Sequence, residues 1–275
     1  MEGAGPAFCT SCATRYGSAD GIWECAPAFE PAAFPAARRD HLAAIEEQNF
    51  WFPARLRLIE RILVRARPPA WRAALDLGCG TGAFLAVLAR HFESVGGVDG
   101  HRASLVAARG RTGDAELFHA DVAAVPLADR QFDLVSALDV LEHMDPERFL
   151  TEAARLLRPG GLLLLSVPAC PALWSALDEA AGHRRRYTRA VLRAELAAFP
   201  GRLQGSTNYQ MLLLPLALLG RRAIGGRAQA LERRPPAWLN RLLGALNAFE
   251  VALLGGFSLP AGSSLVAWAR KEVAT

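Results

Sequence analysis

The stretch Leu75-Asp76-Leu77-Gly78-Cys79-Gly80-Thr81-Gly82-Ala83-Phe84 decides the fold. It leads from a short apolar segment through a glycine-rich turn into a helical segment. Glycine has no Cβ, so such a turn lets the backbone pass close to a ligand. The spacing is G-x-G-x-G, whereas a dinucleotide-binding turn is G-x-G-x-x-G and places a pyrophosphate on the following helix. A carboxylate at Asp76 would face that pyrophosphate badly, and it suits a cationic group such as the ammonium of an amino acid.

Around this turn, strand patterns alternate with helix patterns. We expect strands at 73–77, 94–98, 116–119, 132–138, 162–167, 203–209 and 264–269, and helices at 83–91, 102–109, 146–157 and 189–199. The segment 173–182 is expected to be a helix or a lid, and another helix is expected at 40–47. Such alternation predicts an α/β fold with a parallel sheet and helices on both of its faces.

Two further acids follow strand ends. Asp99 ends the second expected strand, a position from which a carboxylate commonly accepts hydrogen bonds from a ribose diol. Asp121 follows the third strand and could accept a hydrogen bond from an adenine amino group while Val122 packs on the ring. In a doubly wound sheet these strand ends open on one crevice, which is where ligands bind.

Five motifs occur in order: Leu-Asp-Leu-Gly-Cys-Gly-Thr-Gly, Val-Asp-Gly, Ala-Asp-Val, Phe-Asp-Leu-Val-Ser-Ala-Leu-Asp-Val-Leu-Glu-His and Leu-Arg-Pro-Gly-Gly. Over residues 72–168 the chain resembles the class I S-adenosylmethionine-dependent methyltransferases of the type 11/12 branch, near the ubiquinone-biosynthesis O-methyltransferases. The resemblance implies a Rossmann-like, seven-stranded, mostly parallel sheet with an antiparallel last strand, and S-adenosyl-L-methionine as cofactor.

Cofactor contacts are expected along the same strand ends. The residues are Asp76, Leu77, Gly78, Cys79, Gly80, Thr81, Gly82, Asp99, Gly100, Asp121, Val122, Leu138, Asp139 and His143. In the resembling branch the pair Glu142-His143 sits close to the cofactor pocket. His143 is expected to support or cap its neighbours rather than to act as a base.

The acceptor side of the site is expected after the fifth strand, where a glycine precedes a histidine, three arginines and a tyrosine. His183 is the candidate general base, with Arg186 and Tyr187 addressing the acceptor, although local packing and a solvated arginine face explain the same residues. The aromatic block at 50–52, with Arg55, is expected either to wall the crevice or simply to pack its helix on the sheet.

We expect the first 40 residues to form a loosely structured appendage, followed by the methyltransferase domain at 41–275. Cys9, Cys12 and Cys25 invite a zinc site, but three thiolates do not close a tetrahedral site, so a decayed site or free thiols stay open. We therefore name no metal ligands. With an odd number of cysteines and no visible secretory signal, a reducing cytoplasm is expected.

An apolar helical insertion is expected at 210–262, before the last strand. Arginines are interspersed along it, which suits helices lying at a membrane interface. A lid over a hydrophobic acceptor, a dimer interface or an extended hydrophobic core fits the same pattern. No apolar stretch is long enough to span a membrane. Small-molecule and lipid-linked acceptors both suit such a site.

Composition narrows the function classes. With 52% hydrophobic residues, the chain can bury enough surface to fold. Lys271 is the single lysine among 31 basic residues and the net charge is only +4, so nucleic acid is not favoured as a partner. We expect methyl transfer to an oxygen or nitrogen atom. A non-catalytic, membrane-associated cofactor-binding protein, a nicotinamide-dependent oxidoreductase and an RNA methyltransferase remain alternatives.

Overall fold

The computed structural model describes residues 7–8, 14–25, 49–66, 70–224, 235–253 and 258–273. The helix expected at 40–47, together with Cys9 and Cys12, lies outside these residues, as does part of the insertion at 210–262.

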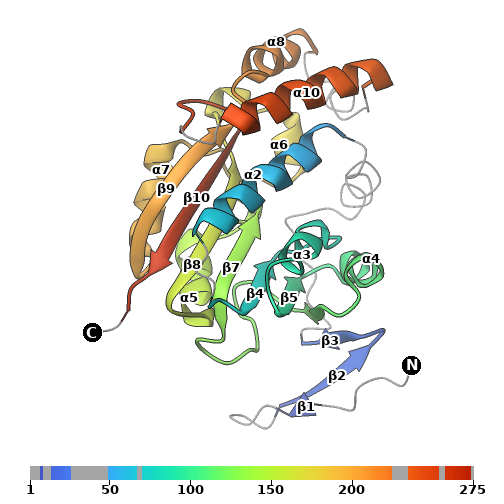
Figure 1. Ribbon diagram of the computed structural model, residues 1–275, viewed down its shortest axis with the longest axis vertical. Helices are drawn as coiled ribbons and strands as arrows, with labels where there is room; N and C mark the ends of the chain where they lie inside the picture. The colour runs from blue at the N-terminus through green and yellow to red at the C-terminus, as the bar shows by residue number, and fades with distance from the viewer. Residues whose placement is uncertain are drawn as a thin grey trace.

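A mixed β-sheet forms the centre of the molecule (Figure 1). The seven strands expected from the sequence run in the order β6-β5-β4-β7-β8-β10-β9, and β10 is antiparallel to both of its neighbours. The strands are β4 (Ala73–Leu77), β5 (Ser94–Asp99), β6 (Glu116–His119), β7 (Phe132–Leu138), β8 (Leu157–Pro168), β9 (Gly201–Tyr209) and β10 (Ser264–Lys271). The predicted parallel core and antiparallel last strand are therefore confirmed.

The N-terminal segment extends this sheet, contrary to the expectation from sequence. Strands β1 (Ala7–Phe8), β2 (Arg15–Ala19) and β3 (Ile22–Glu24) bring the sheet to ten strands, and β3 pairs in parallel with β6. The turn between β2 and β3 is Asp20-Gly21, with positive φ at both residues. An Asp-Gly pair between two strand-forming segments is a hairpin signal. The prediction of a loose appendage was therefore wrong for residues 14–25.

A partly buried polar contact fixes β3 in place. Glu24 binds the side chains of Arg102 (Nε to Oε1, 2.7 Å) and His119 (Nδ1 to Oε2, 2.9 Å). Burial raises the pKa of Glu24, but these two hydrogen bonds outweigh it and leave the pKa below its usual value. The hairpin thus attaches to the start of α4 (Arg102–Thr112) and to the end of β6.

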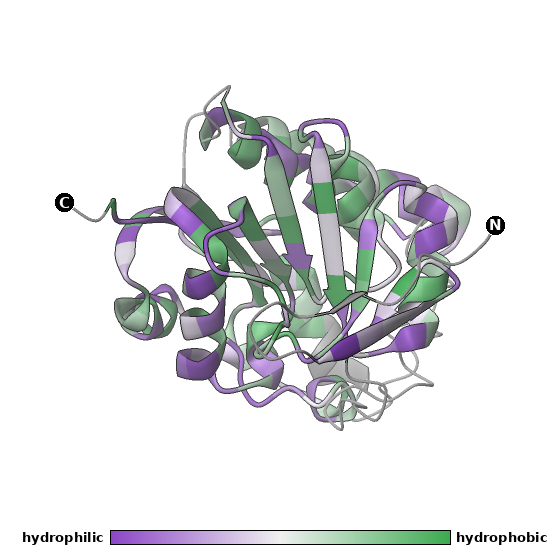
Figure 2. Cartoon of the chain, turned by 90° about the horizontal axis from the view of Figure 1, so that it is seen from below, coloured by the Kyte–Doolittle hydropathy of each residue, from purple (hydrophilic) through white to green (hydrophobic). Residues whose placement is uncertain are grey.

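Helices cover both faces of the sheet, and each face has its own hydrophobic core. One face carries α2 (Trp51–Ala66), α3 (Ala83–Leu88), α4 (Arg102–Thr112) and α10 (Ala237–Leu253), and the other carries α5 (Pro146–Leu156) and α7 (Arg189–Glu195). The central strands are hydrophobic along most of their length (Figure 2), as strands buried on both faces must be.

The shorter elements follow local capping signals. After β8 come η2 (Pro171–Leu173) and α6 (Ala176–Ala180), which begins with a capping box of Ser175 and Asp178. The helix expected at 189–199 ends in a 3₁₀ turn, η3 (Leu196–Ala198).

The insertion before the last strand is helical, as predicted, and consists of α8 (Leu214–Ile224) and α10 in the residues that the structure describes. Helix α10 is tied to α2, because Arg61 Nη1 donates to Val251 O (2.6 Å) and the amide of Phe50 donates to Asn240 Oδ1 (3.0 Å). No helix within these described ranges is long and apolar enough to cross a membrane.

Candidate active site

The glycine turn after β4 has a backbone that only glycine accommodates well. Gly78 has φ of 74°, and a Cβ there would lie 2.4 Å from Cγ2 of Val140. Gly80 has φ of 54°, and a Cβ there would meet no heavy atom within 4 Å. The turn therefore packs tightly against the β7 end at Gly78 and faces open space at Gly80. That combination is what a ligand-binding turn requires.

Asp99, at the end of β5, holds this turn. Its carboxylate accepts hydrogen bonds from the amides of Gly80 (2.8 Å) and His101 (2.7 Å). Burial raises the pKa of Asp99, and the two backbone hydrogen bonds oppose that rise. The side chain thus joins the glycine turn to the start of α4, a structural role that was not predicted from sequence. Its predicted contact with a ribose stays a prediction.

Asp76 is buried at the end of β4, with 2% of its surface exposed. Ser136 Oγ donates to its Oδ1 at 2.6 Å. Burial raises the pKa of Asp76 to about 7, and the charge of Asp99 adds to the rise. A cationic group placed against this carboxyl would favour its ionised form.

The residues expected to contact adenine follow β6 in the structure. Asp121 accepts hydrogen bonds from the amide of Ala123 (2.9 Å) and from Arg148 Nη2 (2.7 Å), and Val122 is buried. Gly100 O pairs with His119 Nε2 at 3.1 Å. Arg148, which was not among the predicted site residues, therefore anchors the Asp121 side chain.

The other predicted cofactor residues line the same turn and the β7 end. Leu77 and Cys79 are buried, and burial raises the pKa of the Cys79 thiol. Thr81 Oγ1 accepts a hydrogen bond from Arg111 Nη1 at 2.9 Å. Gly82 caps α3 in a left-handed conformation, and Leu138 is half-buried at the end of β7.

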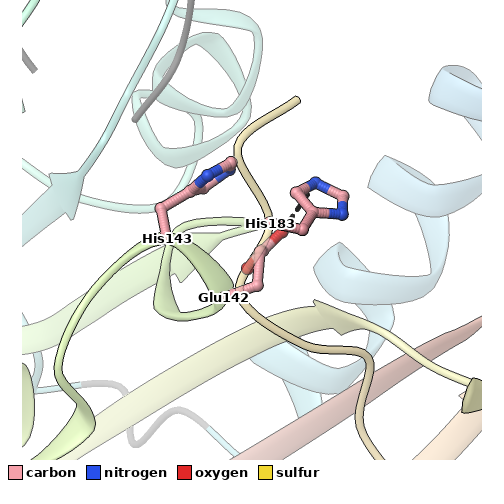
Figure 3. Close-up of side chains that lie close together, drawn as sticks. All are labelled: Glu142, His143 and His183. Atoms are coloured by element: carbon pink, nitrogen blue, oxygen red, sulfur yellow. Dashed lines mark ion pairs between the residues drawn. The ribbon is translucent and has the colours of Figure 1, made fainter. Parts of the chain in front are cut away.

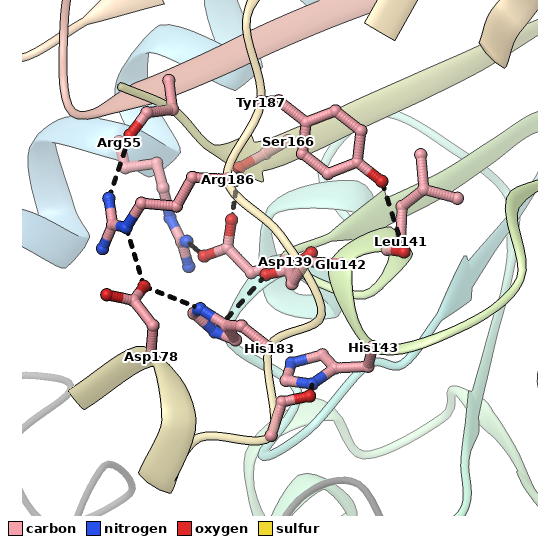
Figure 4. A network of polar contacts seen from close by, with 12 residues as sticks. Arg55, Asp139, Leu141, Glu142, His143, Ser166, Asp178, His183, Arg186 and Tyr187 are labelled. Carbon is pink, nitrogen blue, oxygen red and sulfur yellow. Dashed lines mark hydrogen bonds and ion pairs between the residues drawn. The ribbon is translucent and has the colours of Figure 1, made fainter. Parts of the chain in front are cut away.

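Asp139 links the sheet to helix α2. It forms an ion pair with Arg55 of α2 and accepts a hydrogen bond from Ser166 Oγ at 2.8 Å (Figure 4). Arg55 also lies over the ring of Phe52, 5.5 Å from its centroid. Helix α2 is thus fixed at the carboxyl end of β7, next to the crevice that its aromatic block was expected to wall.

The predicted acceptor residues lie on the segment after α6, which packs against η1 (Leu141–His143). Asp178 is the centre of the contacts, because its Oδ1 binds both His183 Nδ1 (3.0 Å) and Arg186 Nε (2.7 Å) (Figure 4). Arg186 also donates to the carbonyl of Ala169 at 2.9 Å. Asp178 was not predicted as a site residue, although its place five residues before His183 in a polar segment was a usable signal.

Tyr187 is wholly buried in the core. Its hydroxyl lies 3.5 Å from the carbonyl of Leu141, and burial raises its pKa. This position suits packing of the segment against η1, and contact with an acceptor stays a prediction.

Glu142 and His143, on η1, approach His183 (Figure 3). His183 Nε2 lies 3.9 Å from Glu142 Oε1, and His143 Nδ1 lies 3.3 Å from the carbonyl of Gly182. Burial raises the pKa of Glu142 well above its usual value, and the charge of Asp139 adds to this. The structure therefore brings the acceptor candidates and the η1 residues together.

Comparison with known proteins agrees with this geometry. Residues 75–165 match a family model described as a methyltransferase domain. The chain is 32% identical over 139 residues to a probable S-adenosylmethionine-dependent methyltransferase of Mycolicibacterium smegmatis, covering 50% of this chain and 53% of that one. Residues 75–165 therefore form a methyltransferase domain, and the fold around them is that of the class I S-adenosylmethionine-dependent methyltransferases.

The chain is also similar to one further curated protein in sequence and to one solved structure in fold. It is 30% identical over 119 residues to a ubiquinone biosynthesis O-methyltransferase of Coxiella burnetii, covering 42% of this chain and 49% of that one. A putative methyltransferase of Bacillus halodurans has the same fold, with a TM-score of 0.55, 17% identity and coverage of 78% and 99%. The chain spans about half the length of the first curated relatives that it matches.

The residues at these strand ends suit S-adenosylmethionine. The buried Asp76 carboxyl has a single hydrogen-bond donor among the described contacts, Ser136, and offers a partner for the ammonium of the amino-acid moiety. Gly80 faces open space beside it. Asp99 and Asp121 follow at the ends of the next strands, where the nucleoside would lie.

The pKa of Asp76 predicts how cofactor affinity changes with pH. Because the pKa is raised from 3.8 to about 7, the free methyltransferase holds a proton on Asp76 below pH 7. An ammonium group needs the ionised form, so affinity for S-adenosylmethionine should fall about tenfold for each pH unit below 7 and level off above it. Calorimetric titration on both sides of pH 7 measures this, and Asp76→Asn should bind weakly at every pH. The same steep fall in Asp76→Asn would assign the dependence to another group.

Proposed function

We propose that this methyltransferase transfers a methyl group from S-adenosylmethionine to an oxygen or nitrogen atom of a small or lipid-like acceptor. The observation that carries the proposal is the buried Asp76 carboxyl beside the open glycine turn, a pairing that suits a cationic amino-acid ligand. A relative named for ubiquinone biosynthesis and another named malonyl-[acyl-carrier protein] O-methyltransferase support oxygen as the acceptor atom.

Bound S-adenosylmethionine supplies a methyl group on a positively charged sulfonium. As the new bond to the acceptor forms, the carbon–sulfur bond breaks and sulfur keeps the electron pair. The acceptor must lose one proton, and in this proposal His183 accepts it on Nε2. Asp178 supports that role, because it holds Nδ1 of the ring (3.0 Å) and stabilises the protonated form. Arg186 keeps Asp178 in position.

Methyl transfer can be tested directly with methyl-labelled S-adenosylmethionine and a panel of phenols, amines and lipid-linked acceptors. We expect label in at least one oxygen or nitrogen acceptor. Cofactor binding without transfer to any class would favour the non-catalytic alternative, and binding of a nicotinamide cofactor instead would favour an oxidoreductase.

A second proposal concerns where the acceptor is met. Helix α10 carries an exposed stripe of four apolar residues. The exposed fraction of the surface is 67% for Trp238, 51% for Leu242, 37% for Leu246 and 58% for Phe249. Their spacing places them on one helix face. Leu212, just before α8, and Leu216 and Leu219, within α8, are also exposed. Helices α8 and α10 lie at the same end of the molecule (Figure 1).

The charges around this stripe favour an anionic membrane surface as its partner. Arg241 is exposed on α10, whereas Glu250 is buried and accepts the amides of Gln210 (2.5 Å) and Leu212 (2.8 Å). The sequence between α8 and α10 adds further arginines. An apolar face with basic residues beside it is typical of a helix lying in the headgroup region.

Vesicle flotation tests this surface. Binding to vesicles that contain phosphatidylglycerol should fall at least about tenfold in Leu242→Ser/Phe249→Ser, because two apolar side chains no longer insert. The control Val106→Ser/Val191→Ser changes two exposed residues elsewhere and should bind as the wild type. Equal binding of both variants would contradict the proposal, and loss of a dimer on sizing would show that a second copy covers the stripe.

A further inference from the structure

The cluster of Glu142, His143 and His183 has the composition of a metal site. Glu142 and His143 come from η1, and His183 comes from the loop after α6 (Figure 3). One ligand atom from each lies within 4.8 Å of the others. We propose that these three side chains bind a divalent transition-metal ion.

Glu142 is the observation that points to a ligand. Its side chain is wholly buried, and neither carboxylate oxygen has a hydrogen-bond partner among the residues that the structure describes. The nearby ring nitrogen, His183 Nε2, lies at 3.9 Å, which is beyond hydrogen-bond distance. An ionised carboxylate buried without partners is strongly unfavourable, so such groups are normally paired or bound to a metal. A cation between Glu142 and the two rings would supply the missing partner.

The surrounding charges leave room for that cation. Asp139 is paired with Arg55, and Asp178 is paired with Arg186. Each neighbouring carboxylate thus has its own guanidinium, and the charge of Glu142 is left over. The cluster therefore carries a surplus negative charge in its ionised form, as a cation-binding site does.

Both histidine rings are oriented for coordination. Nδ1 of His183 lies 3.0 Å from Asp178 Oδ1, and Nδ1 of His143 lies 3.3 Å from the carbonyl oxygen of Gly182. Because an ionised carboxylate or a carbonyl oxygen can only accept a hydrogen bond, both contacts require a proton on Nδ1. In a ring that carries this one proton, the lone pair is on Nε2. Metal-binding histidines usually donate their other ring nitrogen to a carboxylate or a backbone carbonyl in this way. The ring centroids are 5.0 Å apart, with an angle of 67° between the planes.

Two imidazoles and one carboxylate suit Zn²⁺, Fe²⁺ or Co²⁺ and leave coordination positions open. An acceptor hydroxyl that occupied an open position would lose its proton more readily, because the ion stabilises the oxyanion. This use of the ion rests on the proposed methyl transfer. With the ion bound, His183 Nε2 would be a metal ligand and would no longer serve as the general base, so the proton of the acceptor would pass to solvent water. The binding of the ion does not depend on this use of it.

Calorimetry with Co²⁺ and Zn²⁺ tests binding in full-length protein that has been freed of metal with a chelator. We expect one site per chain on this cluster, weakened at least about a hundredfold in Glu142→Gln and in His183→Gln. The controls Glu179→Gln and His91→Gln remove a carboxylate of α6 and a histidine of another surface, and should bind as the wild type. Unchanged binding in both cluster variants, or no saturable binding, would overturn the proposal.

The absorption spectrum of the Co²⁺ form separates this cluster from the N-terminal cysteines. Nitrogen and oxygen ligation gives weak visible bands, whereas thiolate ligation adds an intense charge-transfer band. We expect only the former, because burial raises the pKa of Cys25 to about 11 and disfavours its thiolate. An intense thiolate band that survives in Glu142→Gln would assign the ion to cysteine instead.

Unfolding experiments guard against a variant that merely fails to fold. Glu142→Gln keeps the side-chain shape and replaces a buried carboxyl group by a neutral amide, so without metal it should unfold at a temperature no lower than the wild type. Added Zn²⁺ should raise the wild-type midpoint and leave that of the variant unchanged. If metal binds but chelator leaves methyl transfer intact, the catalytic use of the ion fails while the proposed function stands. If no acceptor is methylated, metal binding is still decided by calorimetry.

Discussion

Asp99→Ala should reduce affinity for S-adenosylmethionine and S-adenosylhomocysteine by at least about a hundredfold. The carboxylate accepts hydrogen bonds from the amide of Gly80 in the glycine turn and from the amide of His101 at the start of α4, so its loss removes both contacts that join these segments. A hydrogen bond to a charged group contributes about 1.5–3 kcal/mol. If the glycine turn loses its binding geometry when one such bond is lost, the affinity for the cofactor falls by up to about a hundredfold. The predicted contact with the ribose would be lost as well.

Calorimetric titration with both ligands measures this effect. Asp114→Ala is the matched control, because Asp114 is an exposed acid in the loop after α4. It should bind as the wild type. Asp99→Asn separates the two roles of the side chain, since an amide oxygen can still accept one backbone hydrogen bond. Wild-type affinity in Asp99→Ala would contradict both the structural role and the cofactor assignment.

Gly78→Ala should both destabilise the fold and abolish measurable cofactor binding. The new Cβ would lie 2.4 Å from Val140 Cγ2, and φ of 74° is unfavourable for any residue with a Cβ. Backbone strain and overpacking each cost about 1–3 kcal/mol, so we expect a loss of about 3 kcal/mol in the free energy of unfolding. Chemical denaturation measures this loss.

Two further variants divide the effect into its causes. Gly113→Ala introduces a Cβ at a similar φ of 57° with no heavy atom within 4 Å, so it should cost only about 1 kcal/mol from strain. Gly78→Ala/Val140→Ala removes the clash and should recover part of the lost stability. Equal losses in Gly78→Ala and Gly113→Ala would show that Val140 yields easily, contrary to our expectation.

Much of the fold follows from patterns that are local in the chain. The strands around the glycine turn were predicted with nearly their observed bounds, because each is a short apolar segment closed by glycine, proline or an acid. The same locality explains why the acids at the ends of β4, β5 and β6 were found. The strand β3 was missed although its Asp20-Gly21 turn is visible, because a short polar hairpin next to cysteines lacks a strong hydrophobic alternation.

The sequence by itself determined the order of the strands and helices, the glycine turn and the acids beside it, since these depend on side-chain type and spacing within a few residues. Only the tertiary structure decided the partners of those side chains. It brought Arg55 to Asp139, the amides of Gly80 and His101 to Asp99, and His183 to Glu142. Such pairs join residues far apart in the chain, and their geometry depends on how helices and loops pack on the sheet, which no local pattern specifies.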